Sequence, residues 1–163
     1  MLAASPTTLP LFLALSACKG PAVLSGPPPV PAQTQTLLHA VTAELNLIWI
    51  YNKTMAEYSG LQSTLAPLLA EHQAHLARLS ARVVEPPGKK VPDTVTARPA
   101  LDATAAGALT QLRDAEQTAV GVLLSRLGGA SPSLAQLYAS IATSEATHVT
   151  TLTTQISQHP AGS

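Results

Sequence analysis

The chain of 163 residues contains a single cysteine, Cys18, and only 11% of its residues are charged. One cysteine excludes an intrachain disulfide framework and a cysteine-rich metal site. Nine Lys and Arg residues balance nine Asp and Glu residues, so no excess positive charge is present to neutralise phosphates, and we expect no nucleic-acid partner. No apolar run reaches the roughly 18 residues that a membrane-spanning helix needs. The length predicts a single domain.

A short apolar run at residues 9–15 is followed by Ser16, Ala17 and then Cys18. Such a run is typical of a signal peptide, here residues 1–17. The sequence Leu-Ser-Ala-Cys at 15–18 resembles a bacterial lipobox, in which the cysteine is lipidated, although no Lys or Arg precedes the run. The resemblance implies export, with the lipid on Cys18 holding the protein to the outer face of the cell membrane. An ordinary signal peptide with a free cysteine is the alternative.

Residues 18–32 are rich in proline, with Pro27, Pro28, Pro29 and Pro31 close together. Proline lacks a backbone N–H and favours extended polyproline II structure. We therefore expect a semi-rigid tether between the lipidated cysteine and a folded domain at 33–158, and a tail without such a role is the alternative.

Four segments between the proline- and glycine-rich stretches have apolar residues at spacings of three and four, which predicts amphipathic helices. They span about 33–58, 63–84, 102–127 and 132–157. The threonine-rich end of the fourth segment has the poorest helix propensity. With no strand pattern in the sequence, we predict an all-α four-helix bundle.

About 18 proline-rich residues separate the second and third predicted helices. Fully extended, they reach about 60 Å, whereas a 25-residue helix is about 37 Å long. The segment can therefore form a long crossover between helices 2 and 3, which is the ferritin-like topology. An up-down-up-down bundle with a long loose loop is the alternative.

Every predicted helix carries ionisable residues on or beside its apolar stripe, namely Glu44, then His72 and His75, then Glu116, and finally Glu145 and His148. A lone buried carboxylate costs several kcal/mol, so we expect these side chains to meet. In the two antiparallel hairpins, Glu44 lies level with His75, and Glu116 lies level with Glu145, both at mid-height. Corresponding residues of the two hairpins are 72 or 73 positions apart, which indicates a faint two-fold repeat.

This arrangement resembles the ferritin-like superfamily, which places a Glu on helices 1 and 3 and Glu-x-x-His on helices 2 and 4. Glu145-Ala-Thr-His148 matches the helix-4 motif, and Glu44 and Glu116 match the single-Glu positions. Helix 2 departs from the pattern, because Glu71 precedes His75 by four residues. Glu71 is therefore a candidate ligand whose direction is open.

More narrowly, the chain resembles an uncharacterised ferritin-like domain of actinobacterial exported lipoproteins. The similarity covers about 33–157 and is carried by Ala43, Glu44, Leu45 and Tyr51 on the first helix and by His75 and Arg78 on the second. Tyr51 and Tyr138 are predicted to be core aromatics with tethered hydroxyls.

Residues three apart on a helix share one face, so Glu-x-x-His presents a carboxylate and an imidazole together. These ligands suit Fe, Mn or Zn. A di-iron centre usually has four carboxylates and the sequence firmly offers three, so a mononuclear or degenerate site is an equal alternative. A metal-free network of buried hydrogen bonds is another. Carboxylates converging without metal would raise one another's pKa.

Two functions remain open at this point. The first is an exported, lipid-anchored protein that handles metal or performs oxidative chemistry, with Fe, Mn or Zn as its cofactor. The second is a non-catalytic helical-bundle lipoprotein that acts as an envelope scaffold or binding module. The sequence leaves open whether the chain is an enzyme and whether it forms a homodimer.

Overall fold

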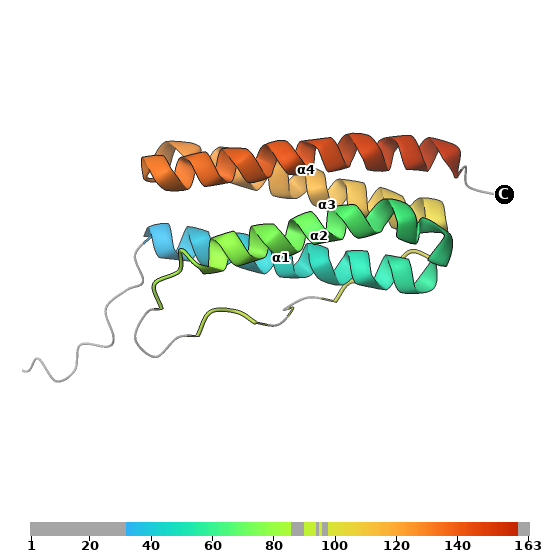
Figure 1. Cartoon of the computed structure of the whole chain (residues 1–163), viewed down its shortest axis with the longest axis horizontal. Coiled ribbons are helices and arrows are strands. Elements are labelled where there is room, and N and C mark those ends of the chain that lie inside the picture. The colour runs from blue at the N-terminus through green and yellow to red at the C-terminus, as the bar shows by residue number, and fades with distance from the viewer. Residues whose placement is uncertain (1–31, 86–89, 94, 96–97, 160–163) are drawn as a thin grey trace, which may run out of the picture.

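The structure, a computed structural model, describes residues 32–85, 90–93, 95 and 98–159. The expected signal peptide, Cys18 and nearly all of the expected tether lie outside the described residues. Four helices, α1 (Ala32–Glu57), α2 (Gln62–Ser80), α3 (Ala105–Ser125) and α4 (Pro132–Gln158), are accompanied by the short 3-10 helices η2 (Ser59–Leu61) and η3 (Leu127–Gly129) (Figure 1). No strand occurs in the described part of the chain, so the predicted all-α bundle of four helices is confirmed. None of these helices is long and apolar enough to cross a membrane.

The helices form two antiparallel hairpins, α1 with α2 and α3 with α4, and α2 runs in the same direction as α3 (Figure 1). Two hydrogen bonds fix this arrangement. The hydroxyl of Tyr58, just after α1, donates to the carbonyl of Asp102, just before α3, over 2.9 Å. At the other end of the bundle, the Gln33 amide donates to the Ser131 hydroxyl over 3.0 Å. The chain therefore crosses the length of the bundle between α2 and α3.

The predicted ends of α1 and α4 agree with the structure to within about one residue, as is usual for helix termini. The predicted end of α2 is wrong by four residues, because the helix stops at Ser80. Beyond it, the Arg82 N–H bonds to the Leu79 carbonyl, three residues back. Such bonds tighten the chain into a turn, and the prolines that follow at 86 and 87 disfavour further helix.

The predicted start of α3, at 102, is three residues too early, since the helix begins at Ala105. Side-chain hydrogen bonds form an N-terminal cap just before it. The Thr104 hydroxyl accepts a hydrogen bond from the Gly107 N–H over 3.0 Å, and Asp102 accepts one from the Thr104 N–H over 3.0 Å. Thr104 is thus the N-cap residue, and Asp102 lies outside the helix.

The threonine-rich end of α4 is helical despite its low propensity. Hydroxyls of this segment donate to backbone carbonyls one turn back, at 2.7–3.2 Å, from Thr150, Thr151, Thr153 and Thr154. These bonds satisfy the hydroxyls within the helix, while packing of the buried face, including Leu152, holds the helix in the bundle.

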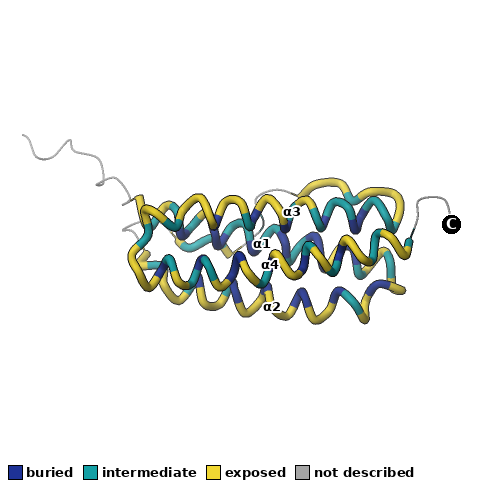
Figure 2. The backbone as a smooth tube through the Cα atoms, turned by 90° about the horizontal axis from the view of Figure 1, so that it is seen from above, coloured by how far each residue is buried: buried dark blue, intermediate teal, exposed yellow. Residues whose placement is uncertain are grey.

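The buried residues of each helix face the inside of the bundle (Figure 2) and form two apolar clusters. The cluster near the start of α1 includes Val41, Leu79, Tyr138 and Ile141, and the cluster near the start of α2 includes Tyr51, Leu65, Leu109, Leu112 and Leu152. In every helix, the buried ionisable residues lie between the part of the helix that contributes to one cluster and the part that contributes to the other. A polar layer therefore crosses the middle of the core, at the height expected from the sequence.

Candidate metal centre

Six ionisable side chains meet in this polar layer, and none is more than 5% exposed: Glu44, His72, His75, Glu116, Glu145 and His148. They come from all four helices. Their ligand atoms form two groups in which all atoms lie within 4.8 Å of one another. The first group contains Glu44, His72, His75 and Glu145, and the second contains His72, Glu116 and His148.

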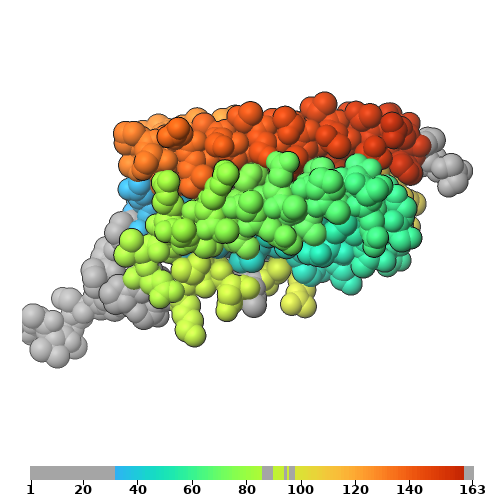
Figure 3. Space-filling model, viewed as in Figure 1, coloured from blue at the N-terminus to red at the C-terminus, as the bar shows by residue number. Residues whose placement is uncertain are grey.

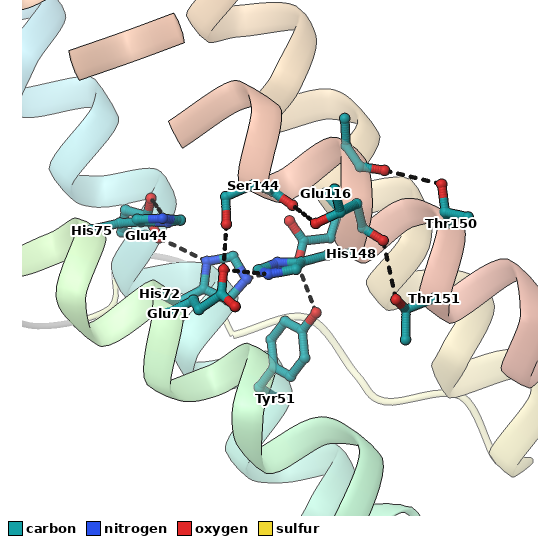
Figure 4. A network of polar contacts seen from close by, with 12 residues as sticks. Glu44, Tyr51, Glu71, His72, His75, Glu116, Ser144, His148, Thr150 and Thr151 are labelled. Carbon is teal, nitrogen blue, oxygen red and sulfur yellow. Dashed lines mark hydrogen bonds and ion pairs between the residues drawn. The ribbon is translucent and has the colours of Figure 1, made fainter. Parts of the chain in front are cut away.

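His72 belongs to both groups and stands between two carboxylates (Figure 4). Its Nδ1 lies 2.8 Å from Glu44 Oε2, and its Nε2 lies 2.7 Å from Glu116 Oε1. Burial alone would lower the pKa of His72, but its hydrogen bonds to Glu116 and Glu44 outweigh burial and raise the pKa to about 10. In this arrangement His72 is an imidazolium whose two N–H groups each donate to a carboxylate.

Glu116 accepts three hydrogen bonds on a single oxygen. Besides His72, the Tyr51 hydroxyl donates to Oε1 over 2.6 Å, and His148 Nδ1 lies 3.2 Å from the same atom. Burial would raise the pKa of Glu116, but the hydrogen bonds from His148 and His72 lower it to about 2. The expectation that convergence raises the pKa of every carboxyl is wrong here, because donors rather than like charges surround this one.

Glu145, in contrast, has the raised pKa that was expected for converging carboxyl groups. Burial raises its pKa to about 9, and the negative charges of Glu44 and Glu116 add to the effect. Its Oε2 has no hydrogen-bond partner among the described residues. His75 Nδ1, in the same group, also lacks a hydrogen bond and lies 3.4 Å from Glu44 Oε1. Two residues of the first group therefore each have one buried polar atom without a hydrogen bond.

Glu71 belongs to neither group of ligand atoms, and its side chain is 55% exposed. Its Oε2 lies 3.2 Å from His148 Nε2 and accepts a hydrogen bond from the Ser144 hydroxyl. The Ser144 hydrogen bond, with a smaller contribution from His148, lowers the pKa of Glu71. Glu71 thus touches the site from the solvent side, because one residue of helix rotates it away from the inward direction of His72.

His72 and His75 are three residues apart, which is also the spacing of Glu145 and His148. The position corresponding to Glu145 on α2 is therefore His72 and not Glu71. The signal was present in the sequence as a His-x-x-His motif in register with Glu-x-x-His, 73 positions earlier.

Tyr51 and Tyr138 are both fully buried, as predicted for core aromatics. Only Tyr51 has a tethered hydroxyl, the one bonded to Glu116. The hydroxyl of Tyr138 has no partner among the described residues, so that part of the prediction is wrong for Tyr138.

No family model, curated protein or solved structure matches the chain. Carboxylate oxygens and imidazole nitrogens without a thiolate suit divalent ions such as Fe, Mn and Zn. The same groups can also stabilise one another as a buried ion-pair network.

Proposed function

We propose that the protein is a ferritin-like bundle that binds one Fe, Mn or Zn ion at Glu44, His72, His75 and Glu145. The observation that carries this proposal is a pair of buried polar atoms without hydrogen bonds, His75 Nδ1 and Glu145 Oε2, on two residues of one group. An unsatisfied buried polar atom costs about 1–3 kcal/mol. A cation bound by both atoms would remove that cost.

The neighbours of this group support the same assignment. If Nδ1 of His72 binds the ion, its Nε2–H still donates to Glu116, 2.7 Å away. A histidine ligand commonly donates its second ring N–H to a carboxylate, which fixes the tautomer and the orientation of the ring. Tyr51 and His148 in turn hold Glu116. An ion bound there would act as a Lewis acid toward a coordinated oxygen.

One ion, rather than two, is the proposed stoichiometry. The second group uses His72 again, and its Glu116 Oε1 already accepts three hydrogen bonds. The three buried carboxylates are also fewer than a di-iron centre usually has. In this proposal Glu116, His148 and Glu71 position the ligands and do not bind the ion.

The ferritin-like assignment is supported by topology together with residue placement. The parallel direction of α2 and α3 (Figure 1) requires the long crossover. Glu44 lies on α1 and Glu116 lies on α3, and both are buried. The Glu-x-x-His motif lies on α4, with His-x-x-His at the matching level of α2.

A second candidate is a metal-free bundle that serves as an envelope scaffold or binding module. One observation favours it: the protonated His72 between Glu44 and Glu116 supplies positive charge to the core without an ion. Both candidates use the same buried residues, so metal content separates them.

The test is metal titration of chelator-treated protein with Zn(II), Mn(II) and anaerobic Fe(II), followed by desalting and elemental analysis. We expect about one ion per chain and a higher Tm, since an ion that binds only the folded state stabilises it. Glu145→Gln and His75→Ala should lose the ion, whereas Glu57→Gln, at the exposed end of α1, should keep it. Less than about 0.1 ion per chain, with no change in Tm, would favour the metal-free bundle.

Export and lipid anchoring at Cys18 remain part of the proposal, on the sequence pattern alone. The test is Cys18→Ser expressed in a bacterium with lipoprotein processing. We expect the variant to leave the membrane fraction, because stable anchoring takes more than one acyl chain or a second signal. Sedimentation of Cys18→Ser with membranes in high salt would contradict the lipobox assignment.

A further inference from the structure

A cleft of about 400 Å³ lies between α1 and α3 and reaches the metal-binding group from the side. Its inner end is formed by Glu44, Leu79 and Glu145, all of them buried. On another face of the molecule, the side chains of α2 and α4 pack against each other (Figure 3). The candidate ion site therefore has an apolar approach between α1 and α3.

The cleft exists because small side chains face it from both helices. Ala40 and Ala43 lie on α1, and Ala115 and Ala119 lie on α3. Leu47, Ile50 and Leu123 complete apolar walls. Alanines alone would indicate only close helix packing, but here they border a volume within the usual range for small-molecule pockets, about 300–1,000 Å³.

Two buried polar atoms of the cleft lining lack hydrogen-bond partners among the described residues. They are Oε2 of Glu145, a residue only 1% exposed, and Oδ1 of Asn46. The Asn46 atom can only accept, whereas the Glu145 carboxyl can donate when it is protonated and accept when it is ionised. A hydroxyl group, which both donates and accepts, can therefore satisfy both atoms in either state.

The charged residues at the inner end of the cleft limit which head group a ligand can have. A carboxylate head group would be repelled by Glu44, and a hydrocarbon would leave both polar atoms without a hydrogen bond. An ammonium group can donate but cannot coordinate an ion. A hydroxyl can donate its proton, and its oxygen can also coordinate a bound metal.

We propose that this cleft binds a small apolar alcohol or phenol, with the hydroxyl toward Glu145 and the hydrocarbon part between the alanines of α1 and α3. One part of this inference, the coordination of the metal ion by the hydroxyl oxygen, rests on the proposed function. The fit of the hydrocarbon part depends on the cleft alone.

The experiment titrates the full chain, with zinc bound and after chelation, with p-cresol, toluene and p-toluate in a calorimeter. We expect one p-cresol per chain with zinc bound, and about tenfold weaker binding of toluene and p-toluate, since a site built to pair a hydroxyl rejects analogues without one. Toluene tests whether binding needs the hydroxyl group, and p-toluate tests whether the site rejects a negatively charged head group.

Two variants fill the cleft, and a third is the matched control. Ala43→Leu and Ala119→Leu should each weaken p-cresol binding at least about tenfold and leave the zinc content unchanged, because the added side chain occupies the ligand volume. Ala70→Leu, on the exposed face of α2, should change neither. Ala43 is less buried than Ala119, so Ala43→Leu remains informative if Ala119→Leu fails to fold.

Absence of p-cresol binding to the zinc-bound protein, or binding that both leucine variants leave unchanged, would overturn the proposal. Equal affinity for p-cresol and p-toluate would overturn the assignment of the head group. If no metal binds but p-cresol still saturates a site that Ala43→Leu removes, the metal function fails and the cleft stands as a ligand site.

Discussion

The two hairpins of the bundle carry matching ionisable residues and differ at one position. The α1–α2 hairpin has Glu44, His72 and His75, and the α3–α4 hairpin has Glu116, Glu145 and His148. At the position where they differ, the α1–α2 hairpin has the imidazole of His72 and the α3–α4 hairpin has the carboxyl group of Glu145. This exchange turns a potential set of four carboxyl groups into three carboxyl groups and one imidazolium.

In the α3–α4 hairpin, the pKa values of Glu116 and Glu145 shift in opposite directions. Glu116 faces His72, Tyr51 and His148, and its pKa falls to about 2. Glu145 has an unsatisfied oxygen, and burial raises its pKa to about 9. The same residue type at the same depth thus becomes a stable anion in one place and a neutral acid in the other.

The largest expected effect is that of His72→Ala, which removes the cation between the hairpins. Two buried carboxylates lose their partner, and we expect the free energy of unfolding at pH 7 to fall by about 3–5 kcal/mol. Denaturant unfolding measures the change. His39→Ala, at an exposed position on α1, should be close to neutral. A small loss for His72→Ala would mean that His72 is not the balancing charge.

Glu116→Gln and Glu145→Gln make the same chemical change at the two contrasting glutamates. Without metal, Glu116→Gln should cost about 1–3 kcal/mol, because buried donors lose a charged acceptor. Glu145→Gln should leave the metal-free protein equally or more stable and should abolish the rise of Tm with zinc. Melting curves with chelator and with Zn(II) measure both. Equal losses in the two metal-free variants would contradict the contrast.

Metal binding should release protons at pH 7. The pKa of Glu145 is raised to about 9 and that of His72 to about 10, so both hold a proton in the metal-free fold and must lose it to coordinate. We expect about two protons released per ion, with affinity rising from pH 6 toward about pH 9. Calorimetry in buffers of different ionisation enthalpy counts the protons.

The same shifts set the sign of the stability change without metal. Both groups bind their protons more tightly in the folded than in the unfolded chain, so their contribution is full below the unfolded pKa. It is lost as the pH rises through about 9 and then about 10. The Tm of the metal-free protein should therefore fall between pH 7 and 10, and a rise there would contradict both assignments.

The smallest expected effect compares the two buried tyrosines. Tyr51→Phe removes the hydrogen bond to Glu116 and should cost about 1–2 kcal/mol. Tyr138→Phe removes a hydroxyl that has no partner among the described residues, and should be neutral or slightly stabilising. Urea unfolding of both variants measures the difference. Equal effects would show that the Tyr51 hydrogen bond contributes little.

The four helices and the inward position of their ionisable residues follow from local features of the sequence. Apolar spacing determines which face of each helix is buried, and the length of the 81–104 segment permits a crossover. Antiparallel hairpins bring residues at equal distance from a loop to the same height, which accounts for the meeting of Glu44 with His75. The predicted bounds were wrong at the end of α2 and at the start of α3. There a few hydrogen bonds, such as those of Thr104 and Arg82, decide where the helix begins or ends, and apolar periodicity does not.

The sequence by itself therefore determined the helices, their buried faces and the polar layer at mid-height. Only the tertiary structure decided that Glu71 stays on the solvent side of the site, that Glu116 and Glu145 differ in charge, and that α1 and α3 leave a cleft. The physical reason is that pairing among buried charges depends on distances of about 3 Å between different helices, and small changes in that spacing decide which groups share a proton. A periodic pattern within one helix carries no information on those distances.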